Sequence, residues 1–239
     1  MKQPKPKPFS KYIDHTNLKP DAVEEDILRL CEEAVKYNFA TACVASCWVS
    51  KASEKLQGSD VRVCTVVGFP FGTSVYPSKT YESKAAIAAG ADEIDVVMNY
   101  GFLKSGKIDL VETELIDIVR TSRGRIVKVI IETCYLTDEE KLLAAKAVRN
   151  SGADYVKTST GFGPAGATPE DVELIKKAFP ELKVKASGGI RTLDYAKKLI
   201  EAGASRIGTS SGIKIIQESE DDKTSSPVTN EDMKSRAHE

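Results

Sequence analysis

Two lysines in apolar surroundings are the residues of this chain best suited to covalent chemistry. Lys157 lies in residues 155–158 and Lys185 in residues 183–187, two short runs typical of buried strands. Most lysines are solvated, so the simplest interpretation of Lys157 is a residue at the surface or on an edge strand. A lysine inside a buried strand is rare, and its neutral amine can attack a carbonyl carbon. We therefore interpret Lys157 as a Schiff-base nucleophile.

Lys185 and Asp95 are the predicted partners of Lys157. Lys183 and Lys185 share one face of their strand, and Lys185 stands nearer the carboxyl end, where a barrel active site forms. A second ammonium group beside Lys157 favours its neutral amine, because like charges repel. Asp95 can pair with Lys185 and move protons through water. A purely structural ion pair explains Asp95 equally well, and the sequence leaves both interpretations open.

Asp14 and His15 end another short apolar run. Asp14 is a candidate to hold one of the lysines or a substrate hydroxyl, and a local hydrogen bond is favoured over catalysis for His15. Cys43 and Cys134 also lie at expected strand ends. Cysteine is commonly a small buried apolar residue, and no neighbouring residue marks either thiol as a nucleophile.

Short runs rich in Val and Ile alternate with longer amphipathic segments along the chain, as in parallel strands covered by helices. The longer segments carry helix signals: Thr137 and Glu140 form a capping-box pattern, and Thr168 and Thr192 are candidate N-caps. The predicted strands are residues 12–14, 41–44, 61–67, 93–98, 127–131, 155–158, 183–187 and 206–209. This order predicts an α/β fold, a single-domain (β/α)8 TIM barrel over residues 11–216.

A repeated hexamer indicates that three of these strands are equivalent. Residues 90–95, 152–157 and 203–208 align without gaps, and each begins with a glycine suited to a helix C-cap. Asp95, Lys157 and Gly208 hold the same place, on the fourth, sixth and eighth strands. Alternate strands of this barrel contribute to the same layer of side chains, so we expect these residues in one layer. Gly208 would leave space there.

Two glycine-rich turns, residues 187–189 and 208–212, follow the last two predicted strands. Such turns are also ordinary connections, but in these barrels they bind phosphate through backbone N–H groups and a helix N-terminus. A threonine and a glycine after Lys157 can add donors. The predicted substrate-binding residues are Asp14, Thr160, Gly161, Gly188, Gly189, Gly208, Ser210 and Ser211.

The composition excludes several classes of protein. With 34 basic and 35 acidic residues among 239, the net charge of −1 gives no general attraction to nucleic acid or an anionic membrane. No apolar run approaches the ~20 residues of a membrane span, and residues 1–10, rich in Lys and Pro, do not resemble a signal peptide. We expect a cytoplasmic protein with free cysteines and no metal. The polar residues 217–239 are predicted to be a disordered tail.

The motifs resemble those of the deoxyribose-phosphate aldolases. The matching segments are residues 13–16, 67–70, 93–99, 131–133, 156–162, 185–191 and 208–212, in the family's order over most of the chain. The resemblance implies Lys157 as the Schiff-base lysine, Lys185 as the activating lysine and Asp95 as its proton-relay partner. It also implies reversible cleavage of 2-deoxy-D-ribose 5-phosphate to D-glyceraldehyde 3-phosphate and acetaldehyde, without a cofactor, in a homodimer or larger homo-oligomer.

One departure and two alternatives accompany this resemblance. Many members carry a proline-containing turn where this chain has Ala45-Ser46, so we expect one pocket wall to differ. A sugar-phosphate isomerase or epimerase on the same barrel is one alternative, although such enzymes usually rely on carboxylates, histidine or a metal. A non-catalytic sugar-phosphate-binding barrel is the other, and the charged residues in the strands argue against it.

Overall fold

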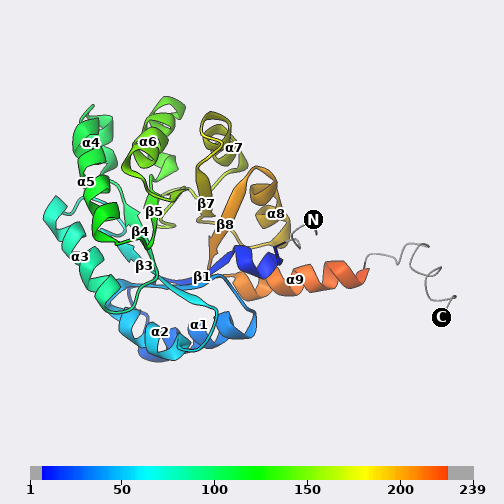
Figure 1. Ribbon diagram of the computed structural model, residues 1–239. Coiled ribbons are helices and arrows are strands. Elements are labelled where there is room, and N and C mark those ends of the chain that lie inside the picture. Colours follow the sequence, from blue (N-terminus) through cyan, green and yellow to red (C-terminus); the bar gives the residue numbers. More distant parts are fainter. Residues whose placement is uncertain (1–6, 226–239) are drawn as a thin grey trace, which may run out of the picture.

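Eight parallel strands close into a barrel. The computed structural model describes residues 7–225, and residues 1–6 and 226–239 lie outside this range. Each strand pairs with the next one in the sequence, and β8 pairs with β1. Helices surround the strands (Figure 1). The strands are β1 Ile13–Asn17, β2 Thr41–Val44, β3 Arg62–Val67, β4 Glu93–Val97, β5 Ile126–Ile130, β6 Tyr155–Lys157, β7 Lys183–Ser187 and β8 Ala204–Thr209. The predicted (β/α)8 TIM barrel is confirmed.

The helices follow the strands in the order expected of this fold. The α-helices are α1 Glu24–Lys36, α2 Val49–Leu56, α3 Tyr76–Ala88, α4 Tyr100–Lys104, α5 Ile108–Thr121, α6 Asp138–Ser151, α7 Pro169–Ala178, α8 Leu193–Glu201 and α9 Gly212–Ser225. Short 3-10 helices cover Phe9–Tyr12, Ser46–Trp48 and Thr133–Tyr135. Among residues 7–225, every helix is too short or too polar to cross a bilayer.

The prediction of a disordered tail from residue 217 is wrong where the structure describes it, because helix α9 continues to residue 225. Ile215 and Ile216 are buried where α9 packs against α8 and β1. The carboxylate of Glu218 also accepts a hydrogen bond of 2.7 Å from the backbone N–H of Leu193, in the first turn of α8. The polar composition of residues 217–225 therefore did not indicate a helix, because contacts with α8 and β1 stabilise it. The rest of the predicted tail lies outside the described residues, as do residues 1–6 of the predicted N-terminal segment.

The local signals in the sequence correspond to real caps. Thr137 Oγ1 accepts from Glu140 N at 3.3 Å, while Thr137 N donates to the Glu140 carboxylate at 2.9 Å, so the capping box at α6 is confirmed. Thr168 and Thr192 cap α7 and α8 through their side chains alone, which accept hydrogen bonds from Asp171 N and Tyr195 N. Gly90, Gly152 and Gly203, which begin the three repeated hexamers, have φ angles of 110°, 78° and 112°. A side chain would be strained there.

Strand β1 is the element that the sequence placed least well. Its predicted range, residues 12–14, covers only its beginning, since the strand extends through His15 and Thr16 to Asn17. These polar residues pair with β2, and His15 also pairs with β8. They are polar because they line a cavity at this end of the barrel. A strand that faces polar surroundings lacks the apolar pattern by which the other strands are recognised.

Candidate active site

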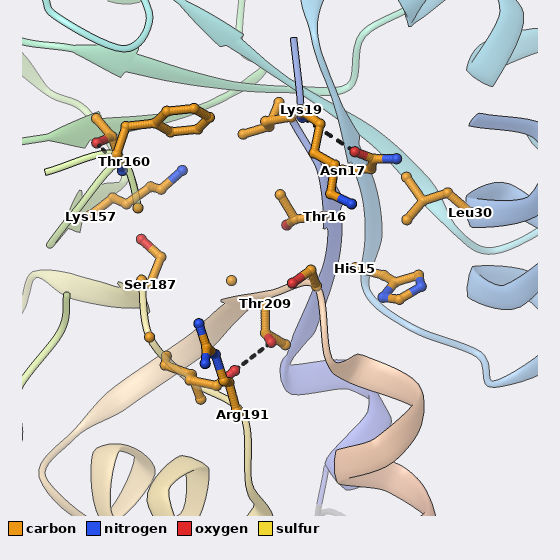
Figure 2. A pocket seen from close by; sticks show the side chains of 18 of the residues that line it. His15, Thr16, Asn17, Lys19, Leu30, Lys157, Thr160, Ser187, Arg191 and Thr209 are labelled. Atoms are coloured by element: carbon orange, nitrogen blue, oxygen red, sulfur yellow. Dashed lines mark hydrogen bonds between the residues drawn. The ribbon is translucent and has the colours of Figure 1, made fainter. Parts of the chain in front are cut away.

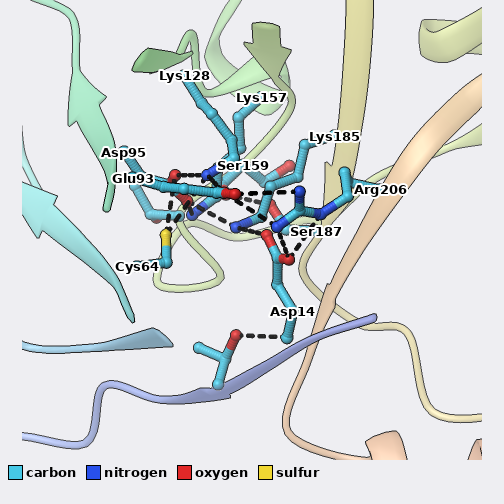
Figure 3. A network of polar contacts seen from close by, with 12 residues as sticks. Asp14, Cys64, Glu93, Asp95, Lys128, Lys157, Ser159, Lys185, Ser187 and Arg206 are labelled. Carbon is cyan, nitrogen blue, oxygen red and sulfur yellow. Dashed lines mark hydrogen bonds and ion pairs between the residues drawn. The ribbon is translucent and has the colours of Figure 1, made fainter. Parts of the chain in front are cut away.

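A cluster of charged side chains fills the inside of the barrel (Figure 3). All of its members are buried, and they come from six strands: Asp14 of β1, Glu93 and Asp95 of β4, Lys128 of β5, Lys157 of β6, Lys185 of β7 and Arg206 of β8. Charged groups are costly in an interior unless they are paired. Every member of this cluster has at least one partner of opposite charge.

Asp95 is bound by three lysines. Its Oδ2 atom lies 2.8 Å from the Nζ atom of Lys157 and 2.7 Å from that of Lys185, and its Oδ1 atom lies 2.7 Å from that of Lys128. Burial alone would raise the pKa of Asp95, but the three ammonium groups outweigh it and hold that pKa well below its usual range. Asp95 is therefore an anion throughout the physiological pH range.

Lys185 lies where the sequence predicted it, beside Lys157. Its Nζ atom contacts Asp14 Oδ2 at 2.5 Å as well as Asp95. Burial would lower the pKa of Lys185, but the two carboxylates outweigh it and raise that pKa above its ordinary value. A Cβ atom at Gly208 would lie 3.0 Å from Lys185 Cε, so the glycine provides the space that Lys185 occupies.

Six of the seven charged residues form a closed ring of alternating charge, which we call the charge ring. Its members in order are Lys128, Glu93, Arg206, Asp14, Lys185 and Asp95. Lys128 lies 2.6 Å from Glu93 Oε2, Arg206 donates to Glu93 Oε2 at 2.9 Å and to Asp14 Oδ1 at 2.7 Å, and the contacts of Lys185 and Asp95 complete the ring. Three positive and three negative charges alternate, and Lys157 contacts the ring from outside, through Asp95.

Sequence reasoning missed Lys128, Glu93 and Arg206, although the sequence contained a signal for each. Lys128 stands in the middle of an apolar strand, as Lys157 does at the end of one. Glu93 precedes Asp95 by two residues, and Arg206 precedes Gly208 by two. Side chains two positions apart on a strand share a face. Applied to Asp95 and Gly208, the alternation used above for Lys183 and Lys185 therefore points to Glu93 and Arg206.

A cavity of about 400 Å³ opens above Lys157 at the carboxyl end of the strands. In the part of the chain that the structure describes, Lys157 is the one member of the cluster that lines it. Asp95 and Lys185 are fully buried beneath the cavity floor. Figure 2 shows the Lys157 side chain extending into this space, with Thr160 and Ser187 beside it. The volume is sufficient for a small metabolite.

The predicted substrate-binding residues divide into two groups. Those that line the cavity are Thr160, Gly161, Gly188, Gly189, Gly208 and Ser210. Asp14 does not line it, because its carboxylate lies in the charge ring below. Ser211 does not line it either, and its backbone N–H donates to Thr209 Oγ1 at 2.9 Å. Arg191, which the sequence analysis did not single out, lines the cavity beside the glycine turn after β7 (Figure 2).

Glu132 anchors the loop that follows Lys157. This residue has a left-handed backbone, with φ of 54°, and its buried carboxylate accepts a hydrogen bond of 3.2 Å from Thr160 N and another from Thr160 Oγ1. Thr160 Oγ1 in turn accepts from Phe162 N at 3.0 Å. The ring of Phe162 meets that of Phe69 edge-on, with centroids 5.3 Å apart. Glu132 therefore fixes one wall of the cavity, a role that its sequence context alone did not indicate.

Several minor expectations can be compared with the structure. His15 Nε2 lies 2.8 Å from Glu33 Oε2 of α1, so its hydrogen bond is to a residue distant in sequence rather than local, and His15 also lines the cavity. All five cysteines are free. The unusual Ala45-Ser46 segment leads into a 3-10 helix, where Ser46 Oγ donates to Glu82 at 3.0 Å. This contact ties the chain after β2 to helix α3 without a proline.

Two groups of potential metal ligands share residues with the charge ring: Cys43, Cys64 and Asp95 form one, and Asp14, Cys64 and Glu93 form the other. In each group the ligand atoms lie within 4.8 Å of one another. The three carboxylates already contact lysine or arginine side chains, which would repel a cation. Neither group fits a metal centre, and a reaction without a metal stays a prediction.

Known proteins resemble this chain over most of its length. The family model described as DeoC/LacD family aldolase matches residues 9–218. Curated proteins named deoxyribose-phosphate aldolase are 56% identical to it: that of Methanocella arvoryzae over 210 residues, covering 87% of this chain and 94% of that protein, and that of Clostridium kluyveri over 212 residues, covering 88% and 97%.

Solved structures give the same result. The tetrameric deoxyribose phosphate aldolase from Aeropyrum pernix is 37% identical, with a TM-score of 0.83 and coverage of 88% of this chain and 90% of that chain. The aldolase QR15 is 42% identical, with a TM-score of 0.87 and coverage of 91% and 98%. These relatives give no support to an isomerase or epimerase. The chain belongs to the DeoC/LacD family of aldolases.

Proposed function

We propose that this protein cleaves 2-deoxy-D-ribose 5-phosphate reversibly to D-glyceraldehyde 3-phosphate and acetaldehyde through a Schiff base on Lys157. The relatives that are 56% identical carry the name of this activity. The observation that carries the proposal is a lysine amine at the floor of an open cavity, next to a charge ring in which positive and negative charges are equal in number. In this proposal the enzyme acts in the cytoplasm, in the breakdown of deoxyribonucleotides.

Charge balance supports Lys157 as the nucleophile. The cluster contains four basic groups and three carboxylates among the described residues, so it is neutral when one base carries no charge. Lys128, Lys185 and Arg206 each contact two carboxylates. Among residues 7–225, Asp95 is the one carboxylate that contacts Lys157, and Lys157 shares it with two other lysines. Lys157 is therefore the base least tied to the ring, and we propose that it supplies the neutral amine that imine formation requires.

The chemistry follows from this amine. The nitrogen of Lys157 adds to C1 of the open-chain sugar, and loss of water gives a protonated imine. A base removes the proton of the C3 hydroxyl, whose oxygen becomes the carbonyl oxygen of glyceraldehyde 3-phosphate. The electron pair of the C2–C3 bond passes to the imine and forms an enamine. The enamine carbon then takes a proton, and hydrolysis releases acetaldehyde and free Lys157.

Asp95 and Lys185 are suited to proton transfer in these steps. Asp95 Oδ2 contacts both Lys157 and Lys185, so a proton can pass between the lysines along one carboxylate oxygen. Both groups are buried next to the nitrogen that changes its bonding. We propose that they hold and relay protons, directly or through a water molecule in the cavity.

The loops after β6, β7 and β8 are the proposed phosphate site. Gly188 and Gly189 have φ angles of 87° and 76°, a backbone that can turn its N–H groups toward an anion. Ser210 lies just before the N-terminus of α9, and Arg191 adds a positive charge on the same side of the cavity. Binding of the distant phosphate would hold C1 of the sugar against Lys157. A homo-oligomer is also part of the proposal, supported by the tetrameric relative.

Trapping of the imine tests the proposal. The protein is incubated with acetaldehyde and reduced with borohydride, and the modified peptide is identified by mass spectrometry. We expect an ethyl group on Lys157, no such adduct in Lys157→Leu, and loss of sugar-phosphate cleavage in that variant. Equal cleavage by both proteins, or the absence of an adduct on every lysine, would rule out the Schiff-base function.

A further inference from the structure

The far side of the charge ring is remote from substrate and yet is connected to Lys157. Lys128 is fully buried and does not line the cavity, and its Nζ atom lies 2.6 Å from Glu93 Oε2 and 2.7 Å from Asp95 Oδ1. Glu93 is also fully buried, and both of its carboxylate oxygens accept hydrogen bonds from Arg206. The mechanism above uses neither residue. A buried ion pair with no such use requires an explanation, because burying it is costly.

We propose that Lys128 and Glu93 are positioning residues that control the charge of the Lys157 amine through Asp95. The proposal rests on the proposed Schiff-base function. Lys128 holds one oxygen of Asp95, while Lys157 and Lys185 share the other. Lys128 thereby competes with Lys157 for the negative charge of Asp95, and Glu93 limits that competition because it attracts Lys128 to the opposite side.

The location of the pair makes this control effective. Lys128, Glu93 and Asp95 are all fully buried, so solvent and salt screen their interactions little. The ring consists of three positive and three negative charges. Removal of either Lys128 or Glu93 leaves it with one unbalanced charge, and the sign of that charge decides whether a proton on Lys157 is favoured or disfavoured.

Other charged or titratable groups also face Lys157 or the ring. They are Asp14 and Arg206 in the ring, Lys185 beside Lys157, the thiols of Cys43 and Cys64 on β2 and β3, Arg62, which approaches Glu93 at 3.7 Å, and Lys7, which interacts electrostatically with Arg206, Asp14 and Glu93. A hydrogen bond with Cys64 lowers the pKa of Cys43 to about 7. Titration of that thiol could resemble titration of Lys157, so the measurements below are repeated in a Cys43→Ser background.

Two substitutions give opposite predictions. Lys128→Met leaves the ring with one net negative charge, which favours the protonated form of Lys157. Its imine trapping with acetaldehyde should therefore need a higher pH, with the midpoint raised by about one unit or more, equivalent to roughly tenfold less trapping on the acid side. Glu93→Gln leaves one net positive charge, and its midpoint should move to lower pH. In the pH profile of kcat/KM, the acid limb should move to higher pH in Lys128→Met and to lower pH in Glu93→Gln.

Lys79 and Glu114 provide a matched control. Their buried ion pair of 2.6 Å joins α3 to α5 outside the barrel, so Lys79→Met and Glu114→Gln repeat the same chemical changes away from the ring. We expect neither to move the midpoint. Urea unfolding verifies that each variant is folded. If Lys128→Met does not fold, the proposal is tested by Glu93→Gln alone, whose trapping midpoint should move to lower pH.

The outcomes are distinguishable. Opposite shifts of the two ring variants, larger than those of the controls, support the proposal. Shifts of the same sign, or a Glu93→Gln midpoint equal to that of wild type, overturn it while wild type still forms the adduct on Lys157. Absence of that adduct from wild type would instead overturn the proposed function itself.

Discussion

Gly208 illustrates how the absence of one side chain determines the position of another. This residue pairs with Asp14 on β1 and with Ser187 on β7, next to the charge ring. A Cβ atom added there would lie 3.0 Å from Lys185 Cε and 3.0 Å from Ser187 Cβ. Both contacts are tighter than carbon atoms normally make, so the methyl group of alanine would push Lys185 and Ser187 aside by a few tenths of an ångström.

We therefore expect Gly208→Ala to lower kcat several-fold, less than the roughly 100-fold that a displacement of about 1 Å can cause, because Lys185 is proposed to take part in proton transfer. Overpacking should also reduce the free energy of unfolding by about 1–3 kcal/mol. Steady-state kinetics and urea unfolding measure the two effects. Gly58→Ala, in an exposed turn away from the ring, is the control for activity and should keep the wild-type kcat, although its φ of 81° means that alanine is strained there as well. A Gly208→Ala enzyme with normal kcat would contradict this account of Lys185.

The sequence located the residues proposed to react better than it located their surroundings. Lys157, Lys185 and Asp95 could be found because a charged residue in an apolar strand is conspicuous. Asp14 was expected to hold a lysine or a substrate hydroxyl, and its contact with Lys185 agrees with the first interpretation. Its place in the charge ring with Arg206 could not be predicted, because the barrel's stagger decides which side chains meet across strands far apart in the sequence. For the same reason, the partners of Lys128 and Arg206 could not be read from the chain.

At the scale of elements, the loops after β6 and β7 hold each other in place. Gly166 and Gly188 pack backbone against backbone, and a Cβ atom at Gly166 would lie 2.1 Å from the carbonyl oxygen of Gly188. Ala167 N also donates to Ser187 O at 3.0 Å. These two loops carry most of the proposed phosphate site, so their contact fixes its shape.

Gly166→Ala should separate the two loops and weaken phosphate binding. We expect KM for the phosphorylated sugar to rise tenfold or more, which corresponds to about 1.4 kcal/mol. Imine formation with acetaldehyde, which has no phosphate, should stay close to wild type. When both assays are carried out on the same protein, KM reports phosphate binding and imine formation reports the chemistry at Lys157. An equal loss in both would mean that the substitution disturbs Lys157 rather than the phosphate site.

Helix α6 permits a prediction about stability alone. Thr137 accepts the hydrogen bond from Glu140 N at the exposed start of this helix, away from the cavity. Thr137→Ala removes this cap and should lower the free energy of unfolding by about 1 kcal/mol without changing kcat. Thr137→Ser retains the hydroxyl and should retain most of the stability. Urea denaturation of the three proteins measures the difference, and a lower kcat in Thr137→Ala would show that the cap also matters to the site.

At the scale of the whole molecule, the charge ring connects strands from both halves of the chain. Asp14 near the start of the barrel binds Arg206 near its end, and Arg206 binds Glu93 of β4. The ring therefore contributes to closure of the barrel as well as to the chemistry inside it. Acid should weaken both, because the ring needs its carboxylates ionised.

The pH dependence of stability has a defined sign. Burial would raise the pKa of Asp14, but Arg206 and Lys185 outweigh it and lower that pKa below its ordinary value. The stabilisation is therefore complete above about pH 4, the unfolded value, and is lost as the pH falls toward the folded value. Asp14→Asn should lose about 3–5 kcal/mol at pH 7, and its difference from wild type should shrink below pH 4. Urea unfolding at several pH values measures this, and a difference independent of pH would contradict it.

The closed ring also limits how this protein can change over evolution. A single substitution that removes one ring charge disturbs both the barrel and the amine above it, whereas two substitutions that remove one charge of each sign leave the sum unchanged. Descendants of this chain should therefore exchange ring residues in oppositely charged pairs. Such paired exchanges offer protein engineers a means to adjust the working pH of the enzyme while every side chain in contact with the sugar stays the same.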